Sequence, residues 1–242
     1  MDLSKEANGL KEIAKYSIIK TPKVLTATPG LLVLEWIETQ NPEKKSFTNF
    51  AVQLAKLHKI TNESYGFYEN NYIGSLPQEN PLVTHKKNEW IGYFFHHRIL
   101  TQVQLAENQG YADASLLRSL AKLESEIPRI LENSLEPPSL VHGDLWSGNF
   151  MIGPMGAAYL IDPAVYYGHR EVDLAMTQLF GGFPKSFYDA YAEEYPLQPG
   201  FEKRCRLYQI YYLLAHLNLF GPSYYQQCLG VIEGLLKKAL FI

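Results

Sequence analysis

A short hairpin flanked by polar side chains constrains the fold more than any other feature of this sequence. Two apolar runs, Phe150–Ile152 and Ala157–Ile161, enclose the turn-forming tetrad Gly153–Gly156, which predicts two antiparallel strands joined by a tight turn. Asn149 precedes the first strand and Asp162 follows the second. Because the two ends of a hairpin lie side by side, these side chains should converge. Two converging oxygen ligands suit Mg²⁺, which takes few protein oxygens and completes its shell with water and phosphates.

The loop before the hairpin carries another carboxylate. Asp144 lies five residues before Asn149, in the run His142-Gly-Asp-Leu-Trp-Ser-Gly-Asn149. Phosphoryl transfer uses one aspartate to orient and deprotonate the attacking hydroxyl, while metal ions neutralise the phosphate charge. Asp-x4-Asn followed by a metal-binding Asp is the arrangement of kinase catalytic loops. The spacing therefore predicts Asp144 as the catalytic base, with Asn149 and Asp162 holding magnesium.

Two departures from the protein-kinase pattern favour a small-molecule kinase. Gly143 replaces the arginine that usually follows the histidine, and Asp162-Pro163 replaces Asp-Phe-Gly. We interpret His142 as a structural support that braces the loop through hydrogen bonds rather than a residue that transfers protons. The alternative for the polar residues is that Asp144 and Asn149 only cap turns, as these residue types commonly do.

The rest of the sequence predicts a small mixed segment followed by a large helical one. Helical apolar spacing covers residues 3–15, and residues 23–27 and 31–36 have the character of two strands around a Pro-Gly turn. Further helices are predicted over 47–59, 88–108, 115–132 and most of the chain after Glu171, whereas 65–88 is predicted to be a loop. We therefore expect an α+β fold with domains at 1–38 and 39–242, divided near Glu38–Pro42.

Composition excludes several classes of protein. The formal net charge of −3 and pI of about 6.2 argue against a nucleic-acid or membrane-surface footprint, because such surfaces are usually strongly basic. The apolar runs are too short to span a bilayer, and the N-terminus has no apolar signal segment. Cys205 and Cys228 lie in apolar helical sequence and are predicted to be buried free thiols. We expect a cytoplasmic protein without a membrane or nucleic-acid partner.

Several longer motifs resemble the fructosamine kinase (ketosamine 3-kinase) family. They are HGDLWSGN, IDPAVYYGHREVDLAM, QLFGGFPKSFYDAY and LYQIYYLLAHLNLFG, and the resemblance extends from about Leu3 over nearly the whole chain. It implies a protein-kinase-like fold with a truncated small N-lobe and a large, mainly helical C-lobe that contains the catalytic β-hairpin. The implied reaction is ATP- and Mg²⁺-dependent phosphorylation of a sugar hydroxyl on a fructosamine or related ketosamine, free or attached to a glycated protein, which leads to deglycation.

The resemblance also implies roles for individual residues. Asp144 resembles the catalytic base, and Asn149 and Asp162 resemble the magnesium ligands. Trp146 resembles a substrate contact, because an aromatic ring in the catalytic loop can stack on a sugar. Asp173 resembles an aspartate at a helix start that braces the catalytic loop, and a plain helix N-cap is its alternative.

Two N-terminal features complete the resemblance. The segment Leu32–Glu38 resembles the hinge between the lobes, where backbone groups of Glu35, Trp36 and Ile37 would bind the adenine of ATP. Glu6 resembles the glutamate of the first helix that pairs with the ATP-binding lysine.

The sequence departs from the family ahead of Glu6. Family members have strands there that carry a glycine-rich loop and the lysine, yet only five residues precede Glu6. Lys5 cannot substitute, because adjacent helix side chains do not face each other. The sheet edge at Lys23–Ala27 or its partner strand would be unprotected, which predicts a homodimer through that edge.

Three functional interpretations stay open at this point. The first is the ketosamine kinase, either as a fragment of a longer chain or as a minimal enzyme. The second is a degenerate kinase-like protein that binds ligands without turnover, because the lysine and glycine-rich loop are missing. The third is an aminoglycoside- or choline-type phosphotransferase, for which Glu193, Glu194 and Glu202 would supply an acidic pocket, although a solvated acidic face explains them better.

Overall fold

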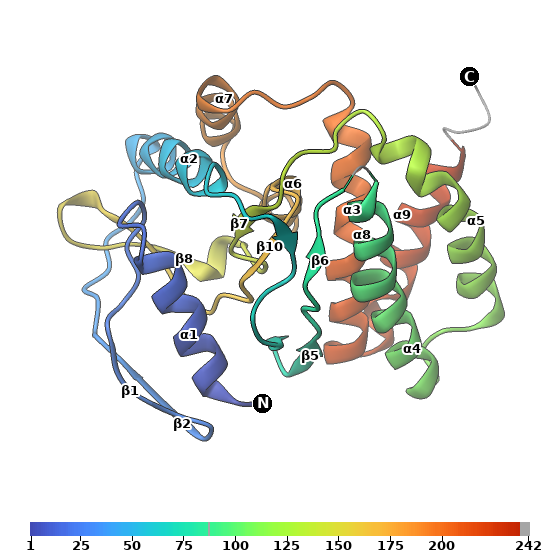
Figure 1. Cartoon of the computed structure of the whole chain (residues 1–242), viewed down its shortest axis with the longest axis horizontal. Coiled ribbons are helices and arrows are strands. Elements are labelled where there is room, and N and C mark those ends of the chain that lie inside the picture. The colour runs from blue at the N-terminus through green and yellow to red at the C-terminus, as the bar shows by residue number, and fades with distance from the viewer. Residues whose placement is uncertain (87, 238–242) are drawn as a thin grey trace.

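Helix α1 (Leu3–Ala14) and the hairpin of β1 (Val24–Thr28) and β2 (Leu31–Leu34) make up the small N-terminal part of the protein (Figure 1). The computed structural model describes residues 1–86 and 88–237. Asp2 caps α1 by accepting a hydrogen bond from the Ser4 backbone N–H at 3.0 Å, and the helix buries the apolar face predicted from its spacing.

The large part is mainly helical, as the sequence predicted. Its helices are α2 (Lys44–His58), α3 (Glu89–Phe94), α4 (Thr101–Asn108), α5 (Ala114–Leu131), α6 (Glu171–Thr177), α7 (Lys185–Glu194), α8 (Phe201–Phe220) and α9 (Tyr225–Lys237). A π-helical turn, Phe95–Leu100, joins α3 to α4 without a break. Helices α2 and α7 pack together at one end, and α3, α4, α5, α8 and α9 form a stack at the other (Figure 1). Cys205 and Cys228 are buried free thiols, which confirms that prediction.

The predicted hairpin is present as β8 (Phe150–Ile152) and β9 (Ala158–Leu160), paired antiparallel with Phe150 opposite Leu160. It packs on α2 through the Phe150 ring, whose centroid lies 4.4 Å from that of Phe50. Burying one such ring stabilises the fold by about 1.5–3 kcal/mol. Both outer edges of the hairpin are also paired: the Gln40 N–H donates to the Ile152 carbonyl at 2.7 Å, and the Leu160 N–H donates to the Lys20 carbonyl at 3.0 Å. The hairpin therefore joins the N-terminal part to the large part.

The prediction of a loop over 65–88 is wrong in part. This segment contains β4 (Asn71–Ile73) and β5 (Leu76–Gln78), which form a hairpin, and β6 (Val83–Thr84), which pairs with β3 (Ser64–Tyr65). A further antiparallel pair consists of β7 (Ser139–Val141) and β10 (Tyr166–Gly168). Strands of two or three residues are too short to show an alternating pattern, so tertiary pairing rather than local sequence defines them.

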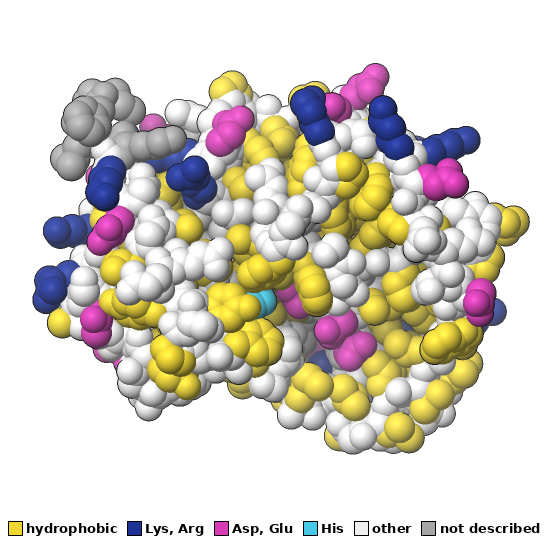
Figure 2. Space-filling model, turned by 180° about the vertical axis from the view of Figure 1, so that it is seen from behind, with side chains coloured by type: hydrophobic (Ala, Val, Ile, Leu, Met, Phe, Trp, Pro, Cys, Tyr) yellow, Lys and Arg dark blue, Asp and Glu magenta, His cyan; other side chains and the backbone are white. Residues whose placement is uncertain are grey.

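The β1–β2 hairpin exposes apolar side chains. Leu25 is 63% exposed, Leu31 51% and Val33 38%, and within the described residues no other strand pairs with this hairpin. Seen from behind, hydrophobic side chains cover much of this end of the molecule, beside a hollow bordered by acidic side chains (Figure 2). Within 1–86 and 88–237, no helix is both long and apolar enough to cross a membrane. The domain boundary at 38/39 and the homodimer stay predictions.

Candidate active site

The loop His142–Asn149, called the catalytic loop below, is anchored by Asp173, the third residue of α6. Its carboxylate accepts hydrogen bonds from the backbone N–H groups of His142 at 2.7 Å and Gly143 at 2.9 Å. Gly143 has φ +84°, and a Cβ there would lie 2.1 Å from the Ala164 carbonyl oxygen, so only glycine fits. The N-cap position of α6 belongs to Arg170. The Asp173 side chain thus binds the loop and does not cap its own helix.

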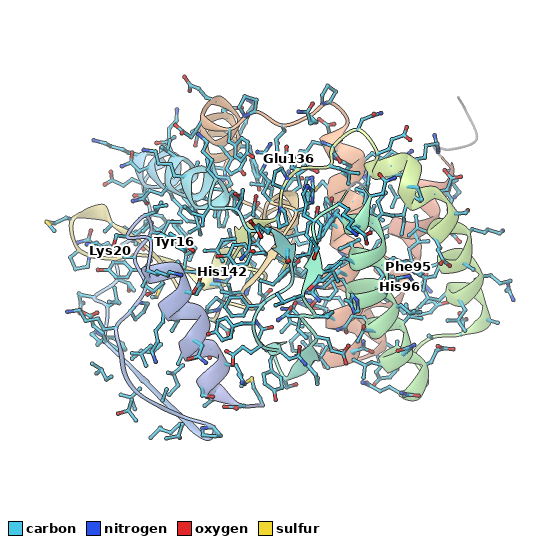
Figure 3. The ribbon with its side chains drawn as sticks, viewed as in Figure 1. Tyr16, Lys20, Phe95, His96, Glu136 and His142 are labelled. Carbon is cyan, nitrogen blue, oxygen red and sulfur yellow. The ribbon has the colours of Figure 1, made fainter. Side chains whose placement is uncertain are left out.

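His142 is fully buried near the centre of the molecule (Figure 3). Its Nε2 lies 3.0 Å from the Ile161 carbonyl oxygen, which can only accept, so Nε2 carries the proton. Its Nδ1 then accepts from the Asp144 N–H at 3.3 Å. An accepting Nδ1 requires a neutral ring, and burial lowers the pKa of His142, which favours that form. The imidazole therefore ties the loop to the end of the hairpin.

Asp144 is half-buried and lies beside Asn149, the residue that precedes β8. Burial raises its pKa to about 7, and the charges of Asp162 and Asp173 act in the same direction. The Asn149 Nδ2 donates to the Asp144 carbonyl oxygen at 2.8 Å and approaches its carboxylate at 3.4 Å. The side chain of Asp144 thus lies next to that of Asn149.

The hairpin brings Asn149 and Asp162 to the same end, because the Ile161 N–H donates to the Asn149 carbonyl at 3.2 Å. Asp162 is exposed and adopts a left-handed conformation with φ 51°. Asn149 is 4% exposed, and its nitrogen faces Asp144, which leaves Oδ1 for a metal. Among the described residues no three His, Cys, Asp or Glu side chains cluster as a metal site. An ion here would rest on these two side chains, substrate phosphates and water.

Glu6, on α1, faces the same region. Its side chain is half-buried, and burial together with the charge of Asp162 raises its pKa to about 7. No Lys or Arg in the described part of the chain forms an ion pair with it. A small pocket lined by Glu6, Asp162 and Pro163 lies between α1 and the hairpin end.

Trp146 presents its ring at the surface of the catalytic loop. The side chain is 38% exposed. One edge of the ring lies over Gly148, where an added Cβ would be 2.3 Å from the indole Cη2. Glycine at 148 thus lets the ring lie flat against the loop, and the rest of the ring is free for stacking.

The predicted adenine-binding segment follows β2 directly. The Glu35 N–H donates to the Lys23 carbonyl at 2.8 Å, and the Glu35 carboxylate accepts from the Lys23 N–H at 3.1 Å. Trp36 is 87% exposed and Ile37 is buried. Within the described residues, the N–H groups of Trp36 and Ile37 make no backbone hydrogen bond. These two residues, rather than Glu35, offer free backbone donors.

Two residues that support the loop were missed in the sequence. His58, at the end of α2, places Nε2 3.1 Å from the Asp173 carboxylate and Nδ1 2.7 Å from the Tyr191 hydroxyl. The Tyr212 hydroxyl donates to the Gly143 carbonyl at 3.1 Å. Within the helix predicted over 47–59, only the polar ring of His58 distinguishes it from the apolar positions around it.

Comparisons with known proteins identify the family. A family model described as fructosamine kinase matches residues 2–238. A probable ketoamine kinase of Enterococcus faecium is 39% identical over 230 residues, covering 94% of this chain and 80% of that protein. A probable ketoamine kinase of Synechocystis is 38% identical over 237 residues, covering 96% and 78%.

Solved structures confirm the protein-kinase-like fold. A putative fructosamine-3-kinase from Thermobifida fusca superimposes with a TM-score of 0.87 at 32% identity, covering 97% of this chain and 80% of that one. Choline kinase LicA from Streptococcus pneumoniae, at 18% identity and a TM-score of 0.63 over 96% of this chain and 83% of that one, shares the fold alone. The chain is a kinase-like phosphotransferase and belongs to the fructosamine kinase family.

Proposed function

We propose that this protein transfers the γ-phosphoryl group of ATP to a sugar hydroxyl of a ketosamine, free or attached to a protein. The observation that carries the proposal is the meeting of Asp144, Asn149 and Asp162 at one end of the β8–β9 hairpin. The names of relatives support the acceptor class: besides the ketoamine kinases, a rice protein named protein-ribulosamine 3-kinase is 35% identical over 239 residues, covering 96% of this chain and 68% of that protein.

The proposed roles follow from position. Asp144 orients the acceptor hydroxyl and takes its proton, and the exposed Trp146 ring stacks on the sugar. Asn149 and Asp162 hold magnesium, which supplies neutralisation of the phosphate charge when bound. His142, Asp173 and His58 keep the loop in place. Free backbone groups at Trp36 and Ile37 bind the adenine.

The test is a coupled assay of ADP release with a fructosamine acceptor. Asp144→Asn keeps the shape of the side chain but removes the base, and we expect turnover to fall by roughly 10²–10⁴-fold. Asp189→Asn is the matched control, because Asp189 lies exposed on α7 and, among the described residues, forms an ion pair with Lys185 alone. Equal turnover of Asp144→Asn and wild type would refute the proposed mechanism.

One observation favours a second candidate, a protein that binds ligand without turnover. Glu6 has no cationic partner in the described residues, although its counterpart in the family pairs with a lysine. Thermal stabilisation by Mg²⁺ and ATP without phosphoryl transfer would support this candidate. Robust transfer to a ketosamine would remove it.

No observation favours an aminoglycoside or choline acceptor. Glu194 pairs with Lys59 at the surface of α7, which fits the solvated face expected for this acidic stretch. A panel of ketosamine, aminoglycoside and choline acceptors in the same assay separates the substrate classes.

A further inference from the structure

Three buried amide side chains gather on and beside the β4–β5 hairpin. Asn71, Gln78 and Asn80 are 5%, 2% and 2% exposed. Buried amides are costly unless their donors and acceptors are paired. The partners of these three therefore show what the hairpin holds in place.

Two of the amides donate hydrogen bonds to backbone carbonyls that follow Asp162. The Asn71 Nδ2 donates to the Val165 carbonyl at 2.7 Å, and the Gln78 Nε2 donates to the Ala164 carbonyl at 3.0 Å. Gln78 also donates to the Asn71 Oδ1 at 2.8 Å, which couples the two side chains. The backbone two and three residues beyond Asp162 is thus held by side chains rather than by a strand ladder.

Asp162 needs such support because its backbone is in an unfavourable region. Its φ of 51° is left-handed, which a residue with a Cβ adopts at a cost of about 1–2 kcal/mol. The turn is fixed before Asp162 by the Ile161 N–H bond to Asn149, and after it by the Ala164 N–H bond to His142 at 2.9 Å. The amides add the remaining restraint on the outgoing side.

Neighbouring groups determine which way the two amides point. The Tyr211 hydroxyl donates to the Gln78 Oε1 at 2.7 Å, so the nitrogen of Gln78 must face Ala164 and Asn71. Asn80 donates to the Asn71 Oδ1 at 3.0 Å, so the nitrogen of Asn71 must face Val165. Flipping Gln78 would set its oxygen against the Ala164 carbonyl oxygen, and flipping Asn71 would set its nitrogen against the donors of Gln78 and Asn80.

Arg98 fixes the last member of the network. Its Nη2 donates to the Asn80 Oδ1 at 2.7 Å and its Nη1 to the Glu79 carbonyl at 2.7 Å. Arg98 is fully buried, its guanidinium carbon lies 4.1 Å from the Tyr166 ring centre, and no carboxylate pairs with it in the described part of the chain. It lies on the π-helical turn that also carries Phe95 and His96 (Figure 3). The buried Nε of Arg98 has no hydrogen-bond partner among the described residues, so the Nη1 and Nη2 hydrogen bonds and the ring contact hold this cation.

We propose that Asn71 and Gln78 are positioning residues for Asp162, and that Arg98 and Tyr211 orient their amides for this task. The inference rests on the proposed role of Asp162 as a magnesium ligand. Holding the carbonyls of Ala164 and Val165 fixes the turn, and the turn fixes the direction of the Asp162 carboxylate. Residues that orient a metal ligand typically change metal affinity or activity by 10–100-fold when replaced.

The test compares Gln78→Met with Gln102→Met in the full chain. Both replace a buried glutamine by an apolar side chain of similar length, and Gln102, on α4, accepts a hydrogen bond from Asn218 away from the site. We expect Gln78→Met to raise the Mg²⁺ concentration at half-maximal rate by about 10–100-fold, with kcat at saturating Mg²⁺ changed much less. Gln102→Met should leave both parameters at the wild-type values.

A second readout needs no turnover. Hydrogen exchange at the Ile161 and Ala164 amides should become faster in Gln78→Met and stay unchanged in Gln102→Met, and Mn²⁺ should bind Gln78→Met more weakly. Unchanged exchange, or faster exchange with unchanged Mn²⁺ and Mg²⁺ dependence, would overturn the positioning role. If wild type lacks turnover, the proposed function fails, while exchange and Mn²⁺ binding still decide this inference.

Discussion

Replacing Asp173 by asparagine should lower both the free energy of unfolding and the turnover, because this carboxylate anchors the catalytic loop. The carboxylate accepts from His142 N–H and Gly143 N–H through different oxygens, and its Oδ2 also lies 3.1 Å from His58 Nε2. In Asp173→Asn one oxygen becomes an NH₂ group. Whichever way the amide points, at least one buried backbone N–H then faces a donor.

The magnitude follows from these contacts. One buried N–H without an acceptor costs about 1–3 kcal/mol, and weakening the remaining charge-assisted bond costs about 1 kcal/mol more. We expect the free energy of unfolding to fall by about 2–4 kcal/mol. Natural domains are stable by about 5–15 kcal/mol, so the variant should still fold.

The assay is urea denaturation followed by tyrosine and tryptophan fluorescence, together with turnover on the folded variant. A displacement of the loop by about 1 Å should reduce kcat by roughly 100-fold. Asp189→Asn, an exposed change on α7, should stay within about 0.5 kcal/mol of wild type. A loss below about 1 kcal/mol in Asp173→Asn would refute the claim that both N–H groups depend on this carboxylate.

Three further predictions concern pH, substrate and assembly. Burial lowers the pKa of His58, so as pH falls through about 6.5 the unfolded chain gains a proton that the folded protein excludes. Stability should therefore drop by about 1.4 kcal/mol per pH unit for this group, and urea titrations below neutral pH should show a smaller drop in His58→Gln. Trp146→Ala should raise KM for the ketosamine roughly tenfold, from about 1.5 kcal/mol of lost apolar contact, and leave KM for ATP unchanged, which initial-rate kinetics measures. Light scattering should find a homodimer that Val33→Lys dissociates, because Val33 lies exposed on the β1–β2 hairpin, and a monomeric wild type would contradict it.

The hairpin end could be predicted from sequence because its signal is local. Turn residues between two apolar runs specify antiparallel pairing, and pairing alone brings Asn149 next to Ile161 and Asp162. Most of the helices were predictable for the same reason, since they carry their own apolar period, whereas α6 and α8 are buried on nearly all sides and show no such period.

What could not be predicted depends on contacts between distant segments. His58 contacts Asp173, and Tyr191 contacts His58, only after α2, α6 and α7 have packed. The π-helical turn at Phe95–Leu100 has no local signature and places Arg98 among tyrosines from other elements. Neither arrangement produces a regular residue spacing, so neither can be recognised in a single sequence.

The pairing of both hairpin edges with N-terminal segments has a consequence for folding. Leu160 binds Lys20 and Ile152 binds Gln40, so the outer edges of both strands pair with segments that lie far earlier in the chain. Closing the long intervening loop costs chain entropy before these contacts can contribute any stabilisation, so they form slowly. During synthesis the N-terminal segments emerge long before the hairpin does. Activity should therefore appear in the last kinetic phase of refolding, after the helices have acquired their own structure.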